Sequence, residues 1–166
     1  MPPTKPALDP NSVATVSRSD YPEPLRSRVL PRAKRSLGDA LGLTRVGINH
    51  TTLLPGKESS MQHWHTHEDE FVYVLEGEVV LRSAAGEQLL EAGMCAGFPA
   101  GSDDAHQFIN RSGRPAVYLE ISNRDPADTA YYSEVDLVWS AAHARDRFTR
   151  RNGSAVEAET PSAPRS

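Results

Sequence analysis

The chain has 166 residues, of which 18 are basic and 22 acidic, so its formal net charge is -4 at pH 7. This balance lacks the basic excess of nucleic-acid-binding proteins, and no segment approaches the roughly 20 apolar residues of a membrane-spanning helix. The length suits one domain with tails. Because no apolar run near the start resembles a signal peptide, we expect a cytoplasmic protein that binds neither nucleic acid nor membrane.

Residues 1–35 are expected to form a flexible tail and an extended arm. Seven prolines fall within the first 34 residues. Because proline removes a backbone donor and restricts its neighbour, we expect no regular helix or central strand here. The arm is expected to begin near Tyr21, whose apolar neighbours could dock on a body. Disorder up to about residue 36 is the alternative.

The middle of the chain carries repeated strand signals, preceded by one short helical turn over residues 36–43. Period-two alternation and turn residues predict strands over residues 44–54, 61–65, 70–76, 78–82, 88–90, 94–98, 107–110 and 116–122. Glu76 and Gly77 separate two β-rich runs and predict a hairpin. Turns recur about every eight to twelve residues, which favours an all-β sandwich or barrel.

The remaining residues are expected to close the barrel and then leave it. Residues 124–129 predict a loop and residues 130–139 a closing strand or an ordered arm, so the barrel domain with its flanking arm spans 36–139. Residues 140–166 predict a C-terminal arm and a disordered tail. Residues 140–151 have some helical character but could instead form an extended arm that reaches Phe148, and 152–166 are rich in small residues and expected to be disordered.

The central stretch has the spacing of a metal site. His63 and His65 lie two apart on one predicted strand and therefore share a face. Glu70 begins the next strand, so its carboxylate could turn back beside them. His106 follows a turn at residues 99–101 and could supply a third imidazole. Imidazoles suit zinc, iron, copper and nickel, and a carboxylate also suits manganese or iron. The spacing therefore predicts four ligands around one divalent transition metal.

The same residues resemble the two sequence motifs of the cupins. The first motif is G-x5-H-x-H-x3 or 4-E-x6-G. It is matched by Gly56, His63, His65, Glu70 and Gly77, with one extra residue between Gly56 and His63 in this sequence. The second motif is G-x5-P-x-G-x2-H-x3-N. It is matched by Gly93, Pro99, Gly101, His106 and Asn110, with two extra residues between Gly101 and His106 in this sequence. A looser likeness outside the motifs, in LGDALGLTRVGIN, NRSGRPAVYLEI and RDPAD followed by tyrosines, resembles small single-domain bacterial cupins of unsettled function.

The resemblance implies a double-stranded β-helix, a small antiparallel barrel with extended N- and C-terminal arms. It also implies that His63, His65, Glu70 and His106 hold one divalent ion per chain, which could be Fe, Mn, Ni or Zn. The alternative is that these histidines lie on strands and make ordinary hydrogen bonds.

Other notable residues are expected to have structural roles. His67 should face solvent, and Glu68 and Asp69 should belong to a solvated turn. Trp64 should point out of the barrel, because it lies between two inward histidines, and Cys95 should be a small core residue rather than a nucleophile.

The fold leaves the function open. The first hypothesis is a small metal-dependent enzyme with dioxygenase or isomerase chemistry on a small oxygenated molecule. The alternative is a cupin that binds or senses such a molecule without turnover. No convincing general acid or base can be named, and Glu120 and Tyr73 are weak candidates. A homodimer is expected, with Trp64, the N-terminal arm and residues 131–132 as possible interface area.

Overall fold

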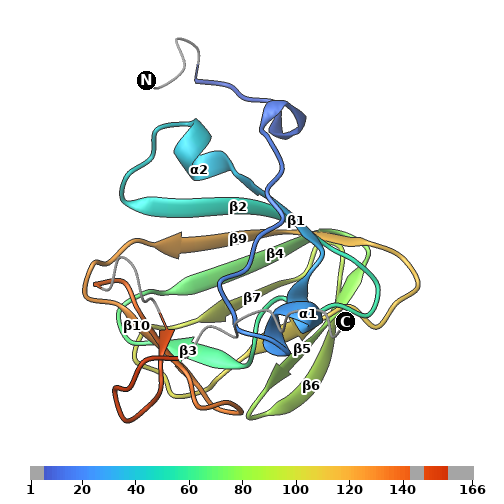
Figure 1. Cartoon of the computed structure of the whole chain (residues 1–166). Coiled ribbons are helices and arrows are strands. Elements are labelled where there is room, and N and C mark those ends of the chain that lie inside the picture. The colour runs from blue at the N-terminus through green and yellow to red at the C-terminus, as the bar shows by residue number, and fades with distance from the viewer. Residues whose placement is uncertain (1–5, 143–147, 157–166) are drawn as a thin grey trace, which may run out of the picture.

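Short antiparallel strands arranged in three sheets make up most of the computed structural model, which describes residues 6–142 and 148–156 (Figure 1). The largest sheet has the order β1 (Arg32–Ser36), β2 (Val46–Leu53), β9 (Ala116–Asn123), β4 (Glu70–Glu76) and β7 (Cys95–Phe98). The second has the order β12 (Phe148–Thr149), β11 (Val138–Ser140), β10 (Thr129–Tyr132) and β3 (His63–His65). The third has the order β6 (Gly86–Glu91), β5 (Glu78–Ser83) and β8 (Gln107–Ile109). The predicted all-β fold is confirmed.

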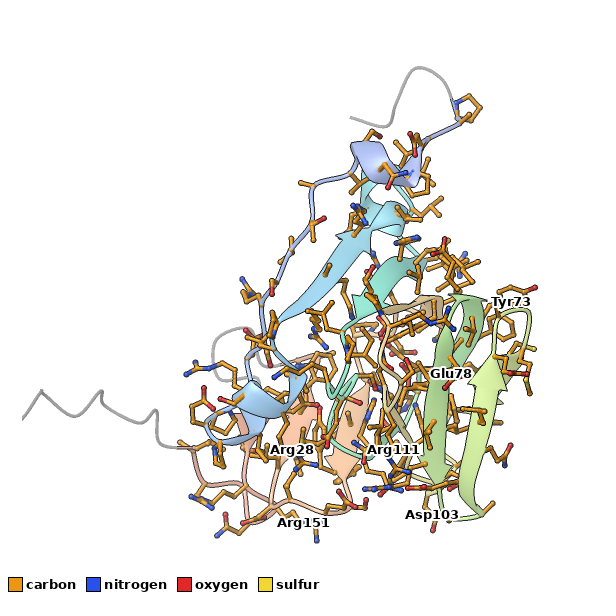
Figure 2. All side chains as sticks on the ribbon, turned by 90° about the vertical axis from the view of Figure 1, so that its right-hand side faces the viewer. Arg28, Tyr73, Glu78, Asp103, Arg111 and Arg151 are labelled. Carbon is orange, nitrogen blue, oxygen red and sulfur yellow. The ribbon has the colours of Figure 1, made fainter. Side chains whose placement is uncertain are left out.

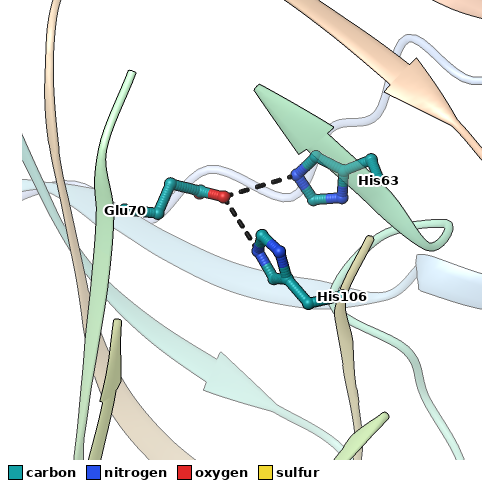
Figure 3. Close-up of side chains that lie close together, drawn as sticks. All are labelled: His63, Glu70 and His106. Atoms are coloured by element: carbon teal, nitrogen blue, oxygen red, sulfur yellow. Dashed lines mark ion pairs between the residues drawn. The ribbon is translucent and has the colours of Figure 1, made fainter. Parts of the chain in front are cut away.

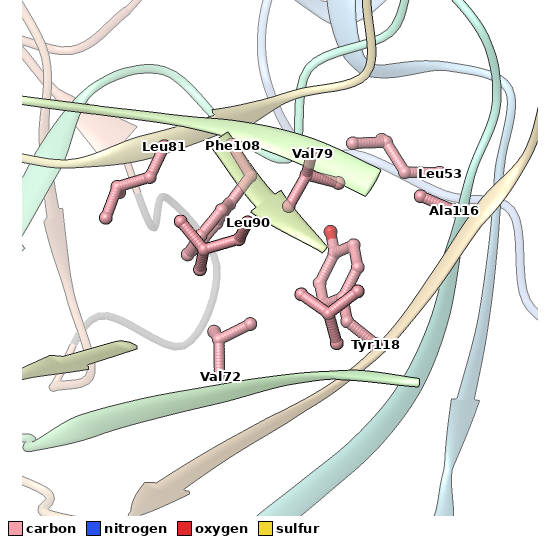
Figure 4. Packing of buried hydrophobic residues seen from close by; sticks show 9 residues of the cluster. Leu53, Val72, Val79, Leu81, Leu90, Phe108, Ala116 and Tyr118 are labelled. Atoms are coloured by element: carbon pink, nitrogen blue, oxygen red, sulfur yellow. The ribbon is translucent and has the colours of Figure 1, made fainter. Parts of the chain in front are cut away.

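Alternation along these strands builds one apolar core between the five-stranded and three-stranded sheets (Figure 4). Its buried members are Leu53, Val72, Val74, Val79, Leu81, Leu90, Phe108, Ala116 and Tyr118. Complete burial of one such large side chain stabilises the fold by about 1.5–3 kcal/mol. Of the metal-site residues expected from the sequence, Glu70 begins strand β4 of this core and His106 immediately precedes strand β8 of it, so the core fixes the backbone near both.

The predicted hairpin at Gly77 is wrong, because β4 and β5 belong to different sheets. Strand β4 is already paired on one side with β9 and on the other with β7. Strand β5 instead forms a hairpin with β6 and pairs on its other edge with β8. Gly77 therefore carries the chain from one sheet to the next. Its φ is +72°, and a Cβ there would lie 2.8 Å from the carbonyl oxygen of Pro115.

The N-terminal arm contains more regular structure than the sequence indicated. A 3-10 turn covers Pro10–Ser12, and a five-residue helix, α1, covers Leu25–Val29 where no helix was expected. Prolines flank α1 rather than interrupt it, which is compatible with a short helix. Strand β1 then extends the edge of the large sheet, and the short helix α2 (Leu37–Ala40) lies where a helical turn was predicted.

Parts of the N-terminal arm and of the C-terminal segment pack on the sheet that carries β3. The buried side chains of this second cluster are Tyr21, Val29, Met61, Ala130, Tyr132 and Leu137. The predicted strand over residues 130–139 is divided into β10 and β11. Part of the expected arm over 140–151 and most of the expected tail over 152–166 lie outside the described residues. In the part of the chain that is described, no helix is long and apolar enough to cross a membrane.

A glycine replacement tests the role of Gly77. Gly77→Ala should lower the free energy of unfolding by at least about 2 kcal/mol, because it adds a close contact with the Pro115 carbonyl to the cost of positive φ. Gly56→Ala is the matched control, since its φ is +75° and nothing lies within 4 Å of its Cβ position. Urea unfolding measures both variants. Equal losses would show that the Pro115 contact is relieved at no cost.

Candidate metal centre and cavity

The structure brings together the four residues that the sequence predicted as ligands. His63 and His65 are the first and last residues of β3, and Glu70 is the first residue of β4. His106 lies immediately before β8, and its backbone exchanges two hydrogen bonds with that of His63, with N···O distances of 3.1 and 2.8 Å. The two extra residues before His106 therefore do not separate it from the other three.

Three imidazole nitrogens face a single carboxylate oxygen of Glu70. Its Oε2 lies 2.9 Å from Nε2 of His106 and 3.6 Å from Nε2 of both His63 and His65. Figure 3 shows the His63 and His106 rings directed at this oxygen. The oxygen is buried and has no well-aligned hydrogen-bond partner among the described residues, although His106 is close enough. Ligand atoms that converge without satisfying one another form a donor set that fits a cation.

The His63, Glu70 and His106 ligand atoms all lie within 4.8 Å of one another. His65 belongs by the same criterion to a neighbouring group with Glu68 and Asp128. Its two ring nitrogens explain both memberships, because Nε2 faces Glu70 while Nδ1 faces Asp128.

The surroundings of Glu70 and His106 set charge states that suit ligation. Burial by itself would raise the pKa of Glu70, but the nearby imidazoles of His106, His63 and His65 outweigh it and hold the pKa well below its usual range. Burial lowers the pKa of His106, and this outweighs its attraction to Glu70. Glu70 is therefore anionic and His106 neutral, and these are the forms that donate lone pairs to a metal.

Each of the three rings is oriented by different contacts. Nδ1 of His63 lies 2.9 Å from the carbonyl oxygen of Met61, which fixes Nδ1 as the protonated nitrogen and leaves Nε2 as the lone-pair donor. The His106 ring stacks on Phe98 with centroids 3.5 Å apart and an interplanar angle of 5°. Nδ1 of His65 lies 2.6 Å from Oδ2 of Asp128. The Nε2 atoms are thus held toward the centre before anything binds.

Asp128 is the part of this site that the sequence did not reveal. It is fully buried, and its Oδ1 accepts backbone hydrogen bonds from His67 at 2.9 Å and Glu68 at 3.3 Å. It lies in the segment over residues 124–129, where the sequence predicts only a loop, and nothing local distinguishes it from the other acidic residue there. Burial would raise the pKa of Asp128, but the hydrogen bonds from His65 and from the His67 and Glu68 backbone, together with the charge of His65, outweigh it, and the pKa is lowered. Asp128 therefore orients the His65 ring without being one of the predicted metal ligands.

The exposure of the turn residues and of Cys95 agrees only in part with what the sequence predicted. His67 and Asp69 are exposed as predicted, but Glu68 is half-buried and accepts a hydrogen bond from the Asp125 backbone at 3.2 Å. The solvated-turn prediction is therefore wrong for Glu68. Cys95 is also not a core residue, because it lies on the outer face of the edge strand β7 and is exposed.

Trp64 turns away from the centre, as alternation predicted. It stacks on Tyr131 of the neighbouring strand β10, with ring centroids 5.0 Å apart. Trp64, which was expected at a dimer interface, therefore makes part of its contacts within the chain. The homodimer stays a prediction.

A cavity of about 250 Å³ opens beside the converging rings. The N-terminal arm contributes Tyr21 to its wall, and the C-terminal strands contribute Trp139 and Phe148. Both arms therefore help to enclose the space next to the candidate ligands. A cavity of this size suits a small ligand, since sites for drug-sized molecules start at about 300 Å³.

The two weak catalytic candidates lie in different places. Glu120 lines the cavity, and its Oε2 lies 2.7 Å from Nζ of Lys34. It stands opposite Val72, on the inward face that Val72 shares with Glu70. Tyr73 points to the outer surface and is 37% exposed, and Figure 2 shows it at the edge of the molecule. Of the two, Glu120 alone is placed to meet a molecule in the cavity.

Comparison with known proteins agrees with this architecture. Residues 49–122 match the cupin domain family. A solved protein of Silicibacter pomeroyi, which is described as a sugar phosphate isomerase from the cupin superfamily, is 42% identical to this chain. The match covers 92% of this chain and 98% of that chain, with a TM-score of 0.85. This chain is a cupin.

Two further relatives differ in what they are described to do. A solved protein of Acidithiobacillus ferrooxidans, proposed to be a sugar phosphate isomerase, is 31% identical over 76% of this cupin and 80% of its own chain, with a TM-score of 0.66. The tetracenomycin polyketide synthase protein TcmJ of Streptomyces glaucescens is 33% identical over 106 residues, which are 63% of this cupin and 69% of TcmJ. Membership of the family is therefore compatible with more than one activity.

Replacing Asp128 tests whether it supports the centre. Asp128→Asn should lower the free energy of unfolding by about 1–3 kcal/mol, because the buried hydrogen bonds to His65 and two backbone N–H groups lose their charged acceptor. Asp125→Asn, in the same segment, is the control and should change it by less than about 0.5 kcal/mol, because its hydrogen bond to Ala127 is exposed. Urea unfolding compares them. A neutral Asp128→Asn would contradict the structural role assigned to this carboxylate.

Proposed function

We propose that this cupin is a metal-dependent enzyme that isomerises a small oxygenated molecule of the sugar phosphate type. The observation that carries the proposal is the convergence of three imidazole Nε2 atoms on one buried carboxylate oxygen beside a small cavity. His63, His65, Glu70 and His106 would hold the ion, one divalent transition metal per chain. The similarity to two proteins described as sugar phosphate isomerases supports this type of reaction over the dioxygenase chemistry that the sequence also allowed.

The bound metal would act as a Lewis acid that polarises the substrate carbonyl. Isomerisation between an aldose and a ketose moves one proton between adjacent carbons and one between their oxygens, and it consumes no other reactant. Glu120 is the residue of this chain that we assign to the carbon proton. It would accept the proton from the carbon next to the carbonyl and return it to the former carbonyl carbon. Lys34, at 2.7 Å, holds the carboxylate in place.

The cavity walls supply the exclusion of water that this proton transfer needs. Tyr21 of the N-terminal arm packs against Phe148 of the C-terminal segment, with ring centroids 5.2 Å apart, and against Tyr132 at 5.7 Å. The Tyr21 hydroxyl accepts a hydrogen bond from the Met61 backbone at 3.2 Å. The aromatic cluster therefore fastens both arms beside β3, where a substrate carbonyl would lie.

Metal content tests the ligand assignment. His63→Ala and His106→Ala should each lose most of the transition metal that the unchanged protein carries when purified without chelator, because each removes one of four ligands. Far-ultraviolet circular dichroism should still show a β protein. His67→Ala, an exposed histidine of the adjoining turn, should keep its metal. Elemental analysis that found equal metal in all variants would show that the ion, if any, binds elsewhere.

Turnover tests the assignment of Glu120. In a panel of aldose and ketose phosphates followed by NMR, the protein should interconvert one pair, and Glu120→Gln should lower kcat by about 10²-fold or more while leaving metal content unchanged. Tyr73→Phe is the control and should match the unchanged protein, because Tyr73 faces outward. Oxygen consumption in such a panel would point to dioxygenase chemistry instead. Ligand-dependent thermal stabilisation without any product would favour the non-catalytic binding cupin.

A further inference from the structure

The edge strand β1 adds two cations to the cavity that holds the candidate metal ligands. Arg32 and Lys34 lie two residues apart, so they share one face of β1, and both line the cavity with His63 and Glu70. Arg35 lies on the opposite face of β1, where its Nε donates a hydrogen bond to the Val13 carbonyl at 3.2 Å. Strand alternation thus places two cations in the cavity, which three carboxylates, those of Asp20, Glu70 and Glu120, also line.

The two cations differ in how their charge is balanced. Lys34 is paired with Glu120 at 2.7 Å. Arg32 instead donates from Nη1 to the Ser59 carbonyl at 2.7 Å and from Nη2 to the Arg18 carbonyl at 3.3 Å. Within residues 6–142 and 148–156, no carboxylate oxygen lies within 4.0 Å of its guanidinium nitrogens. The carbonyls fix the direction of the guanidinium but leave its charge uncompensated, with further N–H groups available.

The neighbouring inward positions are also polar. The hydroxyls of Thr51 and Tyr118 are fully buried and have no hydrogen-bond partner among the described residues. Thr51 stands opposite Lys34 on one side and opposite Tyr118 on the other. The inward positions beside Lys34 therefore carry two hydroxyls without a partner among the described residues, and the Tyr118 ring that bears one of them belongs to the apolar core.

We propose that Arg32 binds the phosphate group of the substrate, with the Lys34 ammonium next to it. The inference rests on the proposed function, because it concerns the phosphate group of the substrate, which is distant from the reacting carbonyl. The planar guanidinium can donate two parallel hydrogen bonds to two phosphate oxygens, and its contacts with Ser59 and Arg18 hold it ready for them. The cavity of about 250 Å³ then limits the substrate to a small phosphorylated sugar or hydroxy-aldehyde.

Titration calorimetry with inorganic phosphate tests this proposal on the full-length, metal-loaded protein. Phosphate should bind, and Arg32→Met should weaken binding by about tenfold or more, because it removes a charged, forked donor. Arg32→Lys should bind with intermediate affinity, since it keeps the charge and loses the fork. Arg35→Met is the matched control on the opposite face of β1 and should bind as the unchanged protein does. Thermal unfolding of each variant identifies any that is not folded.

The His106→Ala variant separates phosphate held by Arg32 from phosphate held by the ion. Phosphate affinity that persists in His106→Ala and is lost in Arg32→Met would assign the site to Arg32. Equal affinity in Arg32→Met and the unchanged protein, or no phosphate binding at all, would overturn the proposal. Acetate binding as tight as phosphate would overturn the assigned class. Arg32-dependent phosphate binding without isomerase turnover would contradict the proposed function alone.

Discussion

The contact of the buried Glu70 Oε2 atom with three imidazole Nε2 atoms is the interaction on which the rest of this structure depends. A carboxylate in a barrel interior is costly unless positive charge or hydrogen bonds compensate it. Here the compensation is incomplete, because Glu70 Oε2 is buried without a well-aligned partner in the described part of the chain while imidazole nitrogens point at it. A divalent cation would satisfy this oxygen and the three nitrogens together. The cost of burying Glu70 Oε2 and the proposed chemistry therefore both call for a cation between these residues.

Sheet pairing explains how segments far apart in the chain can meet at this point. His63 and His106 are joined by a pair of backbone hydrogen bonds, which fixes their rings side by side. Pairing of β10 with β3 then brings the Asp128 segment to His65, so a buried anion orients the third imidazole. The five-stranded sheet adds Glu120 and Arg32 to the same cavity. The functional groups are thus placed by strands of different sheets around one small space.

The sequence was informative where a single strand or turn carries the signal. The two-residue spacing of His63 and His65 and the β-rich run after Glu70 correctly predicted which side chains would share a face. Pairing partners were harder, because alternation does not say which strands pair. The Gly77 hairpin was wrong for this reason, and the structure shows a crossing between sheets instead. Asp128 and Arg32 were missed because Asp128 meets His65, and Arg32 enters the cavity, only through pairing with segments distant in sequence.

The central claim is that His63, His65, Glu70 and His106 share one metal ion. Anomalous X-ray diffraction from crystals of protein purified without chelator, recorded at the absorption edge of the metal found by fluorescence, tests it most directly. One anomalous peak is expected about 2.0–2.2 Å from the three Nε2 atoms and a Glu70 oxygen. No peak among these four side chains, even after the crystals are soaked in Mn²⁺, Ni²⁺ and Zn²⁺, would contradict the claim.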